Sequence, residues 1–291
     1  MGIVTLANAA IEVEVDPVRG GKLTSLVDRR TARQWFVVPE LRQGAPAGYG
    51  ASFHDAGISG WDEMMPTIDA CAVSTPVGDV ELPDHGEVWS IPWEVISRDD
   101  DHVSLAVTGR ALPYRFERTL RLVGESQLRL DYRVEARSAG SFAFLWAAHP
   151  YIRWLPGCRV EFPPGIERVI DVYPRPRGEV AWDESLATFL DHAPDGQGRK
   201  FWCRPDDRPS EVGVRDADGG ALWFSWDPVD VPYLGVWYDA LAVASERAVA
   251  LEPATGFYDD LGRAVQLGRA PTVAPDSPRS WSVDLTLHPA R

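Results

Sequence analysis

The sequence predicts an all-β protein that forms a single domain over residues 1–291. Short runs of alternating apolar and polar residues recur along the chain, helical periodicity is nearly absent, and the 24 prolines and 25 glycines are spread out rather than massed. Alternation with a period of two is the pattern of half-buried strands, and proline and glycine favour the turns between them. A length of 291 residues is large for one domain, but β-sandwiches and barrels reach it as single units.

The chain opens with the pattern of a β-hairpin. Apolar Ile11, Val13 and Val15 alternate with two glutamates, and Asp16-Pro17 with Gly20-Gly21 then supplies turn residues. A second strand pattern follows over residues 22–27.

The densest strand patterns lie between residues 88 and 148. Turn residues at 99–101, 112–113, 124–125 and 139–140 separate them at the spacing of an antiparallel meander. The alternating apolar positions are Val103, Leu105, Val107, Phe116, Leu120, Leu122, Leu128, Leu130, Tyr132 and Val134.

The second half of the chain contains one helical pattern and a terminal strand. Residues 182–192 could form two or three helical turns, and Trp281, Val283, Leu285 and Leu287 lie on one face of a last strand. The stretches without periodicity are expected to be loops, and loops this long are usually functional. They are residues 39–62, 63–87, 153–181 and 191–211, and their His, Trp, Asp and Glu residues predict a binding face.

Charge and cysteine content narrow the class of protein. The formal net charge is −14, and an acidic surface repels nucleic acid and anionic lipid. Three scattered cysteines argue against a disulfide framework and a structural zinc cluster. The N-terminal residues lack the pattern of a secretory leader, and no apolar run approaches the ~20 residues that span a bilayer. We expect a cytoplasmic protein, monomeric or homodimeric, that acts on a small molecule.

Two candidate polar clusters lie in the first long loops. Asp62 and Glu63 are adjacent carboxylates between apolar residues, although one of them could simply cap a turn or pair with an arginine. His85 precedes a glycine that allows close approach of a ligand, and Glu87 follows. The alternative for His85 is a hydrogen-bonded histidine in a turn that enters a strand.

Two further candidates close apolar strands. His149 ends the run Phe144 to Ala148, where a lone histidine is more often a structural residue than a catalyst. Glu252 ends the run 249–251, where burial would raise its pKa towards the value that a general base needs at neutral pH. Twelve tryptophans are also unusual, because aromatic faces stack on sugar rings; roughly seven or eight are expected in the core.

Taken in order, the segments GGKLTSLVD, DHGEVWSIPW, AHPYI and LEPATG resemble the landmarks of the aldose 1-epimerase (galactose mutarotase-like) superfamily. The resemblance covers residues from about 10 to 288. It implies a large antiparallel β-sandwich with a site in a cleft on the concave sheet. The activity that it implies is interconversion of sugar anomers by ring opening and closure, without metal, nucleotide or other cofactor.

The resemblance also implies roles for single residues. Glu252 is the base on the anomeric hydroxyl, His149 is the acid at the ring oxygen, and His85 holds the sugar near that oxygen. Asp62, Glu63, Glu87, Trp237 and Tyr238 are candidates for binding substrate hydroxyls. The chain departs from the galactose-specific pattern because Gly86-Glu87 replaces paired glycines after His85, and no arginine can be matched. A divergent branch with a different sugar is therefore expected.

Two other functions use the same residues. A non-catalytic carbohydrate-binding protein could share the fold, since a fold does not determine a function. A metal-dependent isomerase, lyase or cyclase acting on a modified sugar would need a divalent ion held by oxygen and nitrogen donors. The sequence shows no HxH or HxxxH spacing, which would have strengthened this hypothesis. Its candidate ligands are His54, Asp62, Glu63, His85, Glu87 and His149. An arginine pair such as Arg29 and Arg33 could admit a phosphosugar despite the acidic surface.

Overall fold

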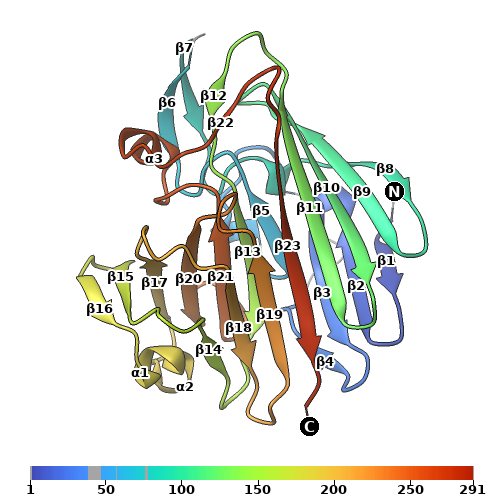
Figure 1. The fold of residues 1–291 in the computed structure, drawn as a ribbon, viewed down its shortest axis with the longest axis vertical. Coiled ribbons are helices and arrows are strands. Elements are labelled where there is room, and N and C mark those ends of the chain that lie inside the picture. The colour runs from blue at the N-terminus through green and yellow to red at the C-terminus, as the bar shows by residue number, and fades with distance from the viewer. Residues whose placement is uncertain (1, 39–46, 57, 76–77, 291) are drawn as a thin grey trace.

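The computed structural model describes residues 2–38, 47–56, 58–75 and 78–290, and two large antiparallel sheets dominate it (Figure 1). The larger sheet has 11 strands in the order β1-β2-β3-β5-β13-β21-β20-β17-β15-β16, with β4 on β3. Its strands are β1 (Val4–Ala7), β2 (Ile11–Asp16), β3 (Lys22–Asp28), β4 (Arg33–Gln34), β5 (Trp61–Met64), β13 (Ala147–Arg153), β15 (Arg168–Tyr173), β16 (Gly178–Ala181), β17 (Gln197–Cys203), β20 (Tyr233–Ala240) and β21 (Ala248–Ala254).

The smaller sheet has eight strands in the order β14-β18-β19-β23-β11-β10-β9-β8. These are β8 (Glu94–Arg98), β9 (His102–Thr108), β10 (Tyr114–Val123), β11 (Gln127–Ala136), β14 (Arg159–Glu161), β18 (Glu211–Arg215), β19 (Ala221–Trp226) and β23 (Arg279–His288). The meander predicted from residues 88–148 is its β8–β11 edge, and the predicted last strand is β23, which lies between β11 and β19. The opening hairpin is also confirmed as β2 and β3.

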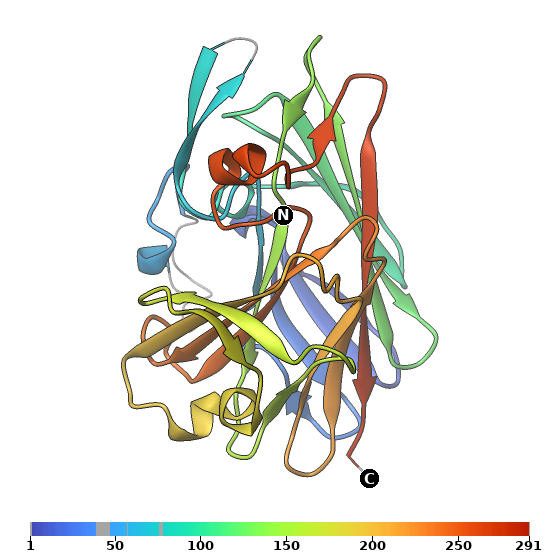
Figure 2. The ribbon, with the colours of Figure 1, turned by 60° about the vertical axis from the view of Figure 1, so that its left-hand side comes forward.

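The two sheets face each other across one large apolar core (Figure 2). Alternate residues of β2, β10, β11 and β23 are buried, as the period-two pattern predicted. Nine of the twelve tryptophans are buried, slightly more than expected, so most of the aromatic content builds the core. They are Trp35, Trp61, Trp89, Trp93, Trp146, Trp154, Trp202, Trp226 and Trp281.

Small elements complete the fold. The two-stranded pairs are β6 (Cys71–Thr75) with β7 (Gly78–Leu82) and β12 (Phe142–Ala143) with β22 (Thr272–Val273). The helices are α1 (Glu184–Ala187), α2 (Phe189–His192) and α3 (Leu261–Gln266), with 3-10 turns η1 (Pro17–Arg19), η2 (His54–Ala56) and η3 (Val88–Ser90). The helical pattern at 182–192 is thus confirmed as α1 and α2. Within the described part of the chain, no helix is long and apolar enough to span a membrane.

The long loops expected from the sequence were partly wrong. Residues 63–87 include β6 and β7, residues 153–181 include β14 to β16, and residues 191–211 include β17. In β17 the alternation is obscured because charged residues occupy half-buried positions and are neutralised across the sheet. Arg199 Nη2 lies 2.8 Å from Asp171 Oδ2, and Lys200 Nζ lies 2.8 Å from Glu252 Oε2. The expected loop 39–62 falls partly outside the described residues.

Candidate functional site

Strand register brings the candidate residues together on the 11-stranded sheet. Asp62 of β5 pairs directly with His149 of β13. Residues 147 and 151 of β13 pair with residues 254 and 250 of β21, which sets His149 opposite Glu252. Gly235 of β20 then pairs with Glu252. Because directly paired residues of antiparallel strands share a face, Asp62, His149 and Glu252 point to the same side of the sheet.

This side is the outer face of the sheet. Glu63, the neighbour of Asp62, contacts Arg118 of β10 and Tyr132 of β11, and therefore faces the opposing sheet. Successive residues of a strand point to opposite faces, so Asp62, His149 and Glu252 face away from the main core. They are nonetheless buried, with side chains 2%, 4% and 0% exposed.

A second hydrophobic cluster accompanies these polar groups. It is separate from the main core and includes Phe53, Tyr151 and Trp89, with Trp237 packed against it. The ring of His149 lies 5.3 Å from the Phe53 ring and 5.0 Å from the Tyr151 ring. The polar groups therefore lie beside an apolar, aromatic wall, which is the usual composition of a small-molecule site.

His149 and Glu252 form the centre of the site. His149 Nε2 lies 3.7 Å from Glu252 Oε1. Burial raises the pKa of Glu252, and the opposing positive charge of Lys200 limits that rise. Burial, reinforced by His85, Lys200 and Lys22, lowers the pKa of His149 well below 6.5. Among the described residues, neither Glu252 Oε1 nor His149 Nδ1 has a hydrogen-bond partner.

Two lysines flank this centre, each paired with a carboxylate. Lys200 Nζ lies 2.8 Å from Glu252 Oε2 and 2.6 Å from Asp259 Oδ1. On the other side of His149, Lys22 Nζ lies 2.7 Å from Asp62 Oδ2. Burial raises the pKa of Asp62 and Lys22 opposes it. In the described structure, Asp62 Oδ1 remains without a partner and can accept a hydrogen bond from a ligand hydroxyl.

His85 reaches the site from the turn before η3. Its ring stacks on Phe53 at 3.9 Å and lies 5.4 Å from the ring of His149. Its backbone φ is +57°, a left-handed conformation that non-glycine residues adopt rarely. Its amide N–H donates to Ile68 O, and Gly86 forms a bridge with Met65. Backbone strain of this kind is held by surrounding structure and concentrates at functional sites.

Gly86→Ala is expected to destabilise the protein by about 1–3 kcal/mol and to displace His85. Gly86 has a φ of +70°, and a Cβ there would lie 2.2 Å from Met65 O, which is backbone and cannot move alone. The free energy of unfolding in urea measures the effect. Gly124→Ala is the matched control, since Gly124 has a φ of +59° and open space around it. Equal losses in the two variants would contradict the close-approach explanation.

Three of the expected substrate-binding residues point elsewhere. Glu63 accepts hydrogen bonds from Tyr132, Trp146 and Arg118 between the sheets. Glu87 is fully buried and accepts hydrogen bonds from the Tyr114 hydroxyl and from two amides at 110–111. Tyr238 is buried in the main core and donates to Leu186 O. In this structure none of the three reaches the face of Glu252, so their role in binding hydroxyls stays a prediction from the sequence. Trp237 does lie on that face, opposite Lys200.

The six candidate metal ligands do not converge. Glu63 and Glu87 are engaged away from the site, and His54 is exposed beside Asp55. In the ranges that the structure describes, no group of three His, Cys, Asp or Glu residues has a metal-binding arrangement. This geometry gives no support to the metal-dependent hypothesis.

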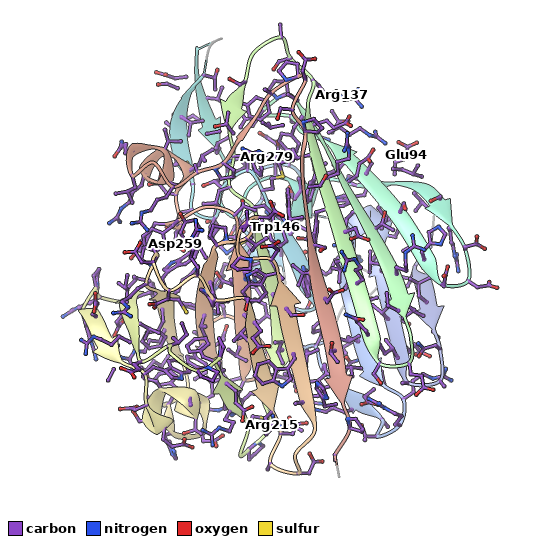
Figure 3. All side chains as sticks on the ribbon, viewed as in Figure 1. Glu94, Arg137, Trp146, Arg215, Asp259 and Arg279 are labelled. Carbon is purple, nitrogen blue, oxygen red and sulfur yellow. The ribbon has the colours of Figure 1, made fainter. Side chains whose placement is uncertain are left out.

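Four residues of the site were not predicted from the sequence: Lys22, Lys200, Asp259 and Phe53. Figure 3 labels Asp259 beside the upper ends of β17 and β20, and an N–H of Trp202 donates to its carboxylate. Lys22 could have been found, because it begins the strand of the segment GGKLTSLVD. Lys200 could not, because the adjacent charges of Arg199 and Lys200 interrupt the alternation of β17. No local pattern relates Asp259 to Lys200.

Comparison with known proteins supports the same fold. No protein-family model matches the sequence, and no curated protein matches it. Among solved structures, a "putative aldose 1-epimerase" from Escherichia coli has a TM-score of 0.76 and 16% identity, covering 98% of both chains. A galactose mutarotase related enzyme from Lactobacillus acidophilus has a TM-score of 0.72 and 14% identity, covering 99% of this chain and 98% of its own.

A third structure, a galactose mutarotase-like protein from Lactobacillus casei, has a TM-score of 0.73 and 14% identity, with 99% of this chain and 100% of its own covered. Identities this low establish the fold alone. The chain has the galactose mutarotase-like β-sandwich fold.

Proposed function

We propose that this protein is an aldose 1-epimerase-like enzyme that interconverts the anomers of an uncharged sugar. The observation that carries the proposal is the buried pair of Glu252 and His149, 3.7 Å apart, with Glu252 Oε1 free of hydrogen bonds within the described structure. A base and an acid held side by side on strands suit a reaction that moves one proton off a hydroxyl and one onto a ring oxygen.

The proposed reaction proceeds in two balanced halves. Glu252 Oε1 takes the proton of the anomeric hydroxyl, the bond between C1 and the ring oxygen breaks, and His149 Nε2 gives a proton to that oxygen. The open-chain aldehyde rotates about C1–C2. In closure, His149 takes the hydroxyl proton back as the oxygen attacks the other face of C1, and Glu252 returns its proton to the carbonyl oxygen.

The surrounding groups suit a neutral polyol. Asp62 Oδ1 is an open acceptor for a hydroxyl on the far side of His149, and Trp237 offers an aromatic face on the same side of the sheet. Both lysines of the site are already neutralised by carboxylates, and Arg33 is held by Asp216. A phosphate group would therefore be repelled by the carboxylates of the site, and none of these three cations is free to bind it. This arrangement favours an uncharged sugar.

The pH dependence follows from the two pKa shifts. Glu252 must be ionised, so activity is lost as the pH falls through its pKa, which burial raises above 4.5. His149 must be protonated, so activity is lost as the pH rises through its pKa, which burial lowers below 6.5. We expect a bell-shaped kcat/KM profile with its maximum on the acidic side of neutrality. A flat profile from pH 7 to 9 would contradict His149 as the acid.

NMR of freshly dissolved α-anomers tests the proposed function. A panel of aldoses is followed with and without the protein, and we expect faster equilibration for at least one member. The rank order of rates indicates the natural sugar, and aldose 6-phosphates in the same panel test the preference for an uncharged ring. Saturable binding of an aldose without any acceleration would overturn the proposal in favour of a carbohydrate-binding protein.

A further inference from the structure

Lys200 holds an unusual position for a lysine. Its side chain is 12% exposed and lies between two carboxylates, 2.8 Å from Glu252 Oε2 and 2.6 Å from Asp259 Oδ1. Its Nζ also lies 5.5 Å from the centre of the Trp202 ring. Buried lysines are rare because the loss of hydration is costly, and this one retains its charge through the two carboxylates, which raise its pKa.

The sheet makes room for this contact at Gly235. Gly235 stands between Glu252 of β21 and β17, in the register that pairs it with both strands. A Cβ there would lie 3.1 Å from Glu252 Oε2 and 3.6 Å from Lys200 Cε. The missing side chain therefore leaves the space that the Lys200 chain and the Glu252 carboxylate share.

The two carboxylate oxygens of Glu252 have different neighbours. Oε2 is held by Lys200, whereas Oε1 is directed to His149 Nε2. Asp259 is itself held in place by hydrogen bonds. Trp202 Nε1 donates to its Oδ2, and the amides of Ile68 and Asp69 donate to its backbone oxygen. Lys200 thus connects a rigid anchor to one oxygen of the proposed base and leaves the other oxygen available.

We propose that Lys200, braced by Asp259, is a positioning residue that fixes the rotamer of Glu252 and keeps it ionised at the pH of turnover. This inference rests on the proposed function of Glu252 as the base. The groups that face Glu252 are Lys200 from β17, Asp259 from the segment before α3, His149 and Tyr151 from β13, and His85 from the turn before η3.

Two substitutions are expected to shift the pKa of Glu252 in opposite directions. Lys200→Met removes the positive charge beside Glu252 and therefore raises the pKa of Glu252. Asp259→Asn removes a negative charge that now raises the Glu252 pKa, and therefore lowers it. A mere loss of packing would not produce shifts of opposite sign.

The carboxyl carbon of Glu252 can be followed by NMR titration of protein labelled with ¹³C at glutamate Cδ and assigned with Glu252→Gln. The matched control is Lys22→Met, which removes a lysine of similar exposure, 11% against 12%, from the equivalent pair with Asp62. We expect a higher Glu252 pKa in Lys200→Met only. Unchanged titration in Lys200→Met, or equal shifts in Lys200→Met and Lys22→Met, would overturn the proposal.

Kinetics then separate this inference from the proposed function. In Lys200→Met the low-pH limb of the kcat/KM profile should move to higher pH. At a fixed pH below that limb, kcat/KM should fall by about tenfold for each unit of the shift, through kcat more than through KM. The NMR titration needs no substrate, so it reports on Lys200 even where no aldose is turned over. Opposite NMR shifts in a protein without epimerase activity would refute the function and leave the control of Glu252 by Lys200 established.

Discussion

Glu252→Gln is expected to lower kcat by about 10²–10⁴-fold, the usual contribution of a positioned acid or base. The amide has the size of the carboxylate but cannot accept the anomeric proton. Lys200 keeps its partner Asp259, so no cation is left unpaired by the change. We therefore expect the fold to survive while turnover is lost.

The rate of anomer equilibration measured by NMR, together with circular dichroism, checks this expectation. His149→Asn should also cut turnover sharply, because it removes the other member of the pair. Glu246→Gln is the control, since Glu246 is a surface carboxylate, 40% exposed and paired with Arg153. Full activity in Glu252→Gln or in His149→Asn would refute the assignment of that residue.

Arg118→Met is expected to destabilise the protein by about 3–5 kcal/mol, the cost of leaving one member of a buried ion pair alone. Arg118 and Glu63 are both 0% exposed and lie 2.7 Å apart between the sheets. Arg118 also donates to Gly21 O and covers the ring of Trp93. Without it, the donors that Glu63 keeps in the described part of the chain are the neutral Tyr132 and Trp146.

The free energy of unfolding in urea measures this effect. Arg129→Met is the control, because Arg129 is 40% exposed and such surface pairs contribute about 0–1 kcal/mol. The double variant Glu63→Gln with Arg118→Met should recover part of the loss, since it removes both charges. A loss below about 1 kcal/mol in Arg118→Met would show that Glu63 is not held as a buried anion.

The fold could be predicted largely because alternation is local. The hairpin at 11–28, the meander up to residue 136 and the strand at 279–288 each show their buried face in a few consecutive residues. The packing of the two sheets and their strand order depend on contacts between distant segments. Only the resemblance to a known superfamily supplied that part.

The candidate site could be predicted less well. Alternation alone could have separated Asp62 from Glu63, because adjacent residues of a strand point to opposite faces. Trp237 and Tyr238 point to opposite faces for the same reason. All four residues of β5 are buried, so residues 61–64 show no alternation by which the strand could be recognised. The ion pair between Lys200 and Glu252 joins residues 52 positions apart in sequence, and no local sequence pattern could have predicted it.

The row of paired positions at Asp62, His149 and Glu252 has a consequence for folding. These residues come from three strands whose pairing joins distant parts of the chain, so forming it requires long segments to be closed into loops at a cost in conformational entropy. A slip of one residue in any of the three would turn its side chain into the core. The three side chains therefore share one face of the sheet only when β5, β13 and β21 have reached this register.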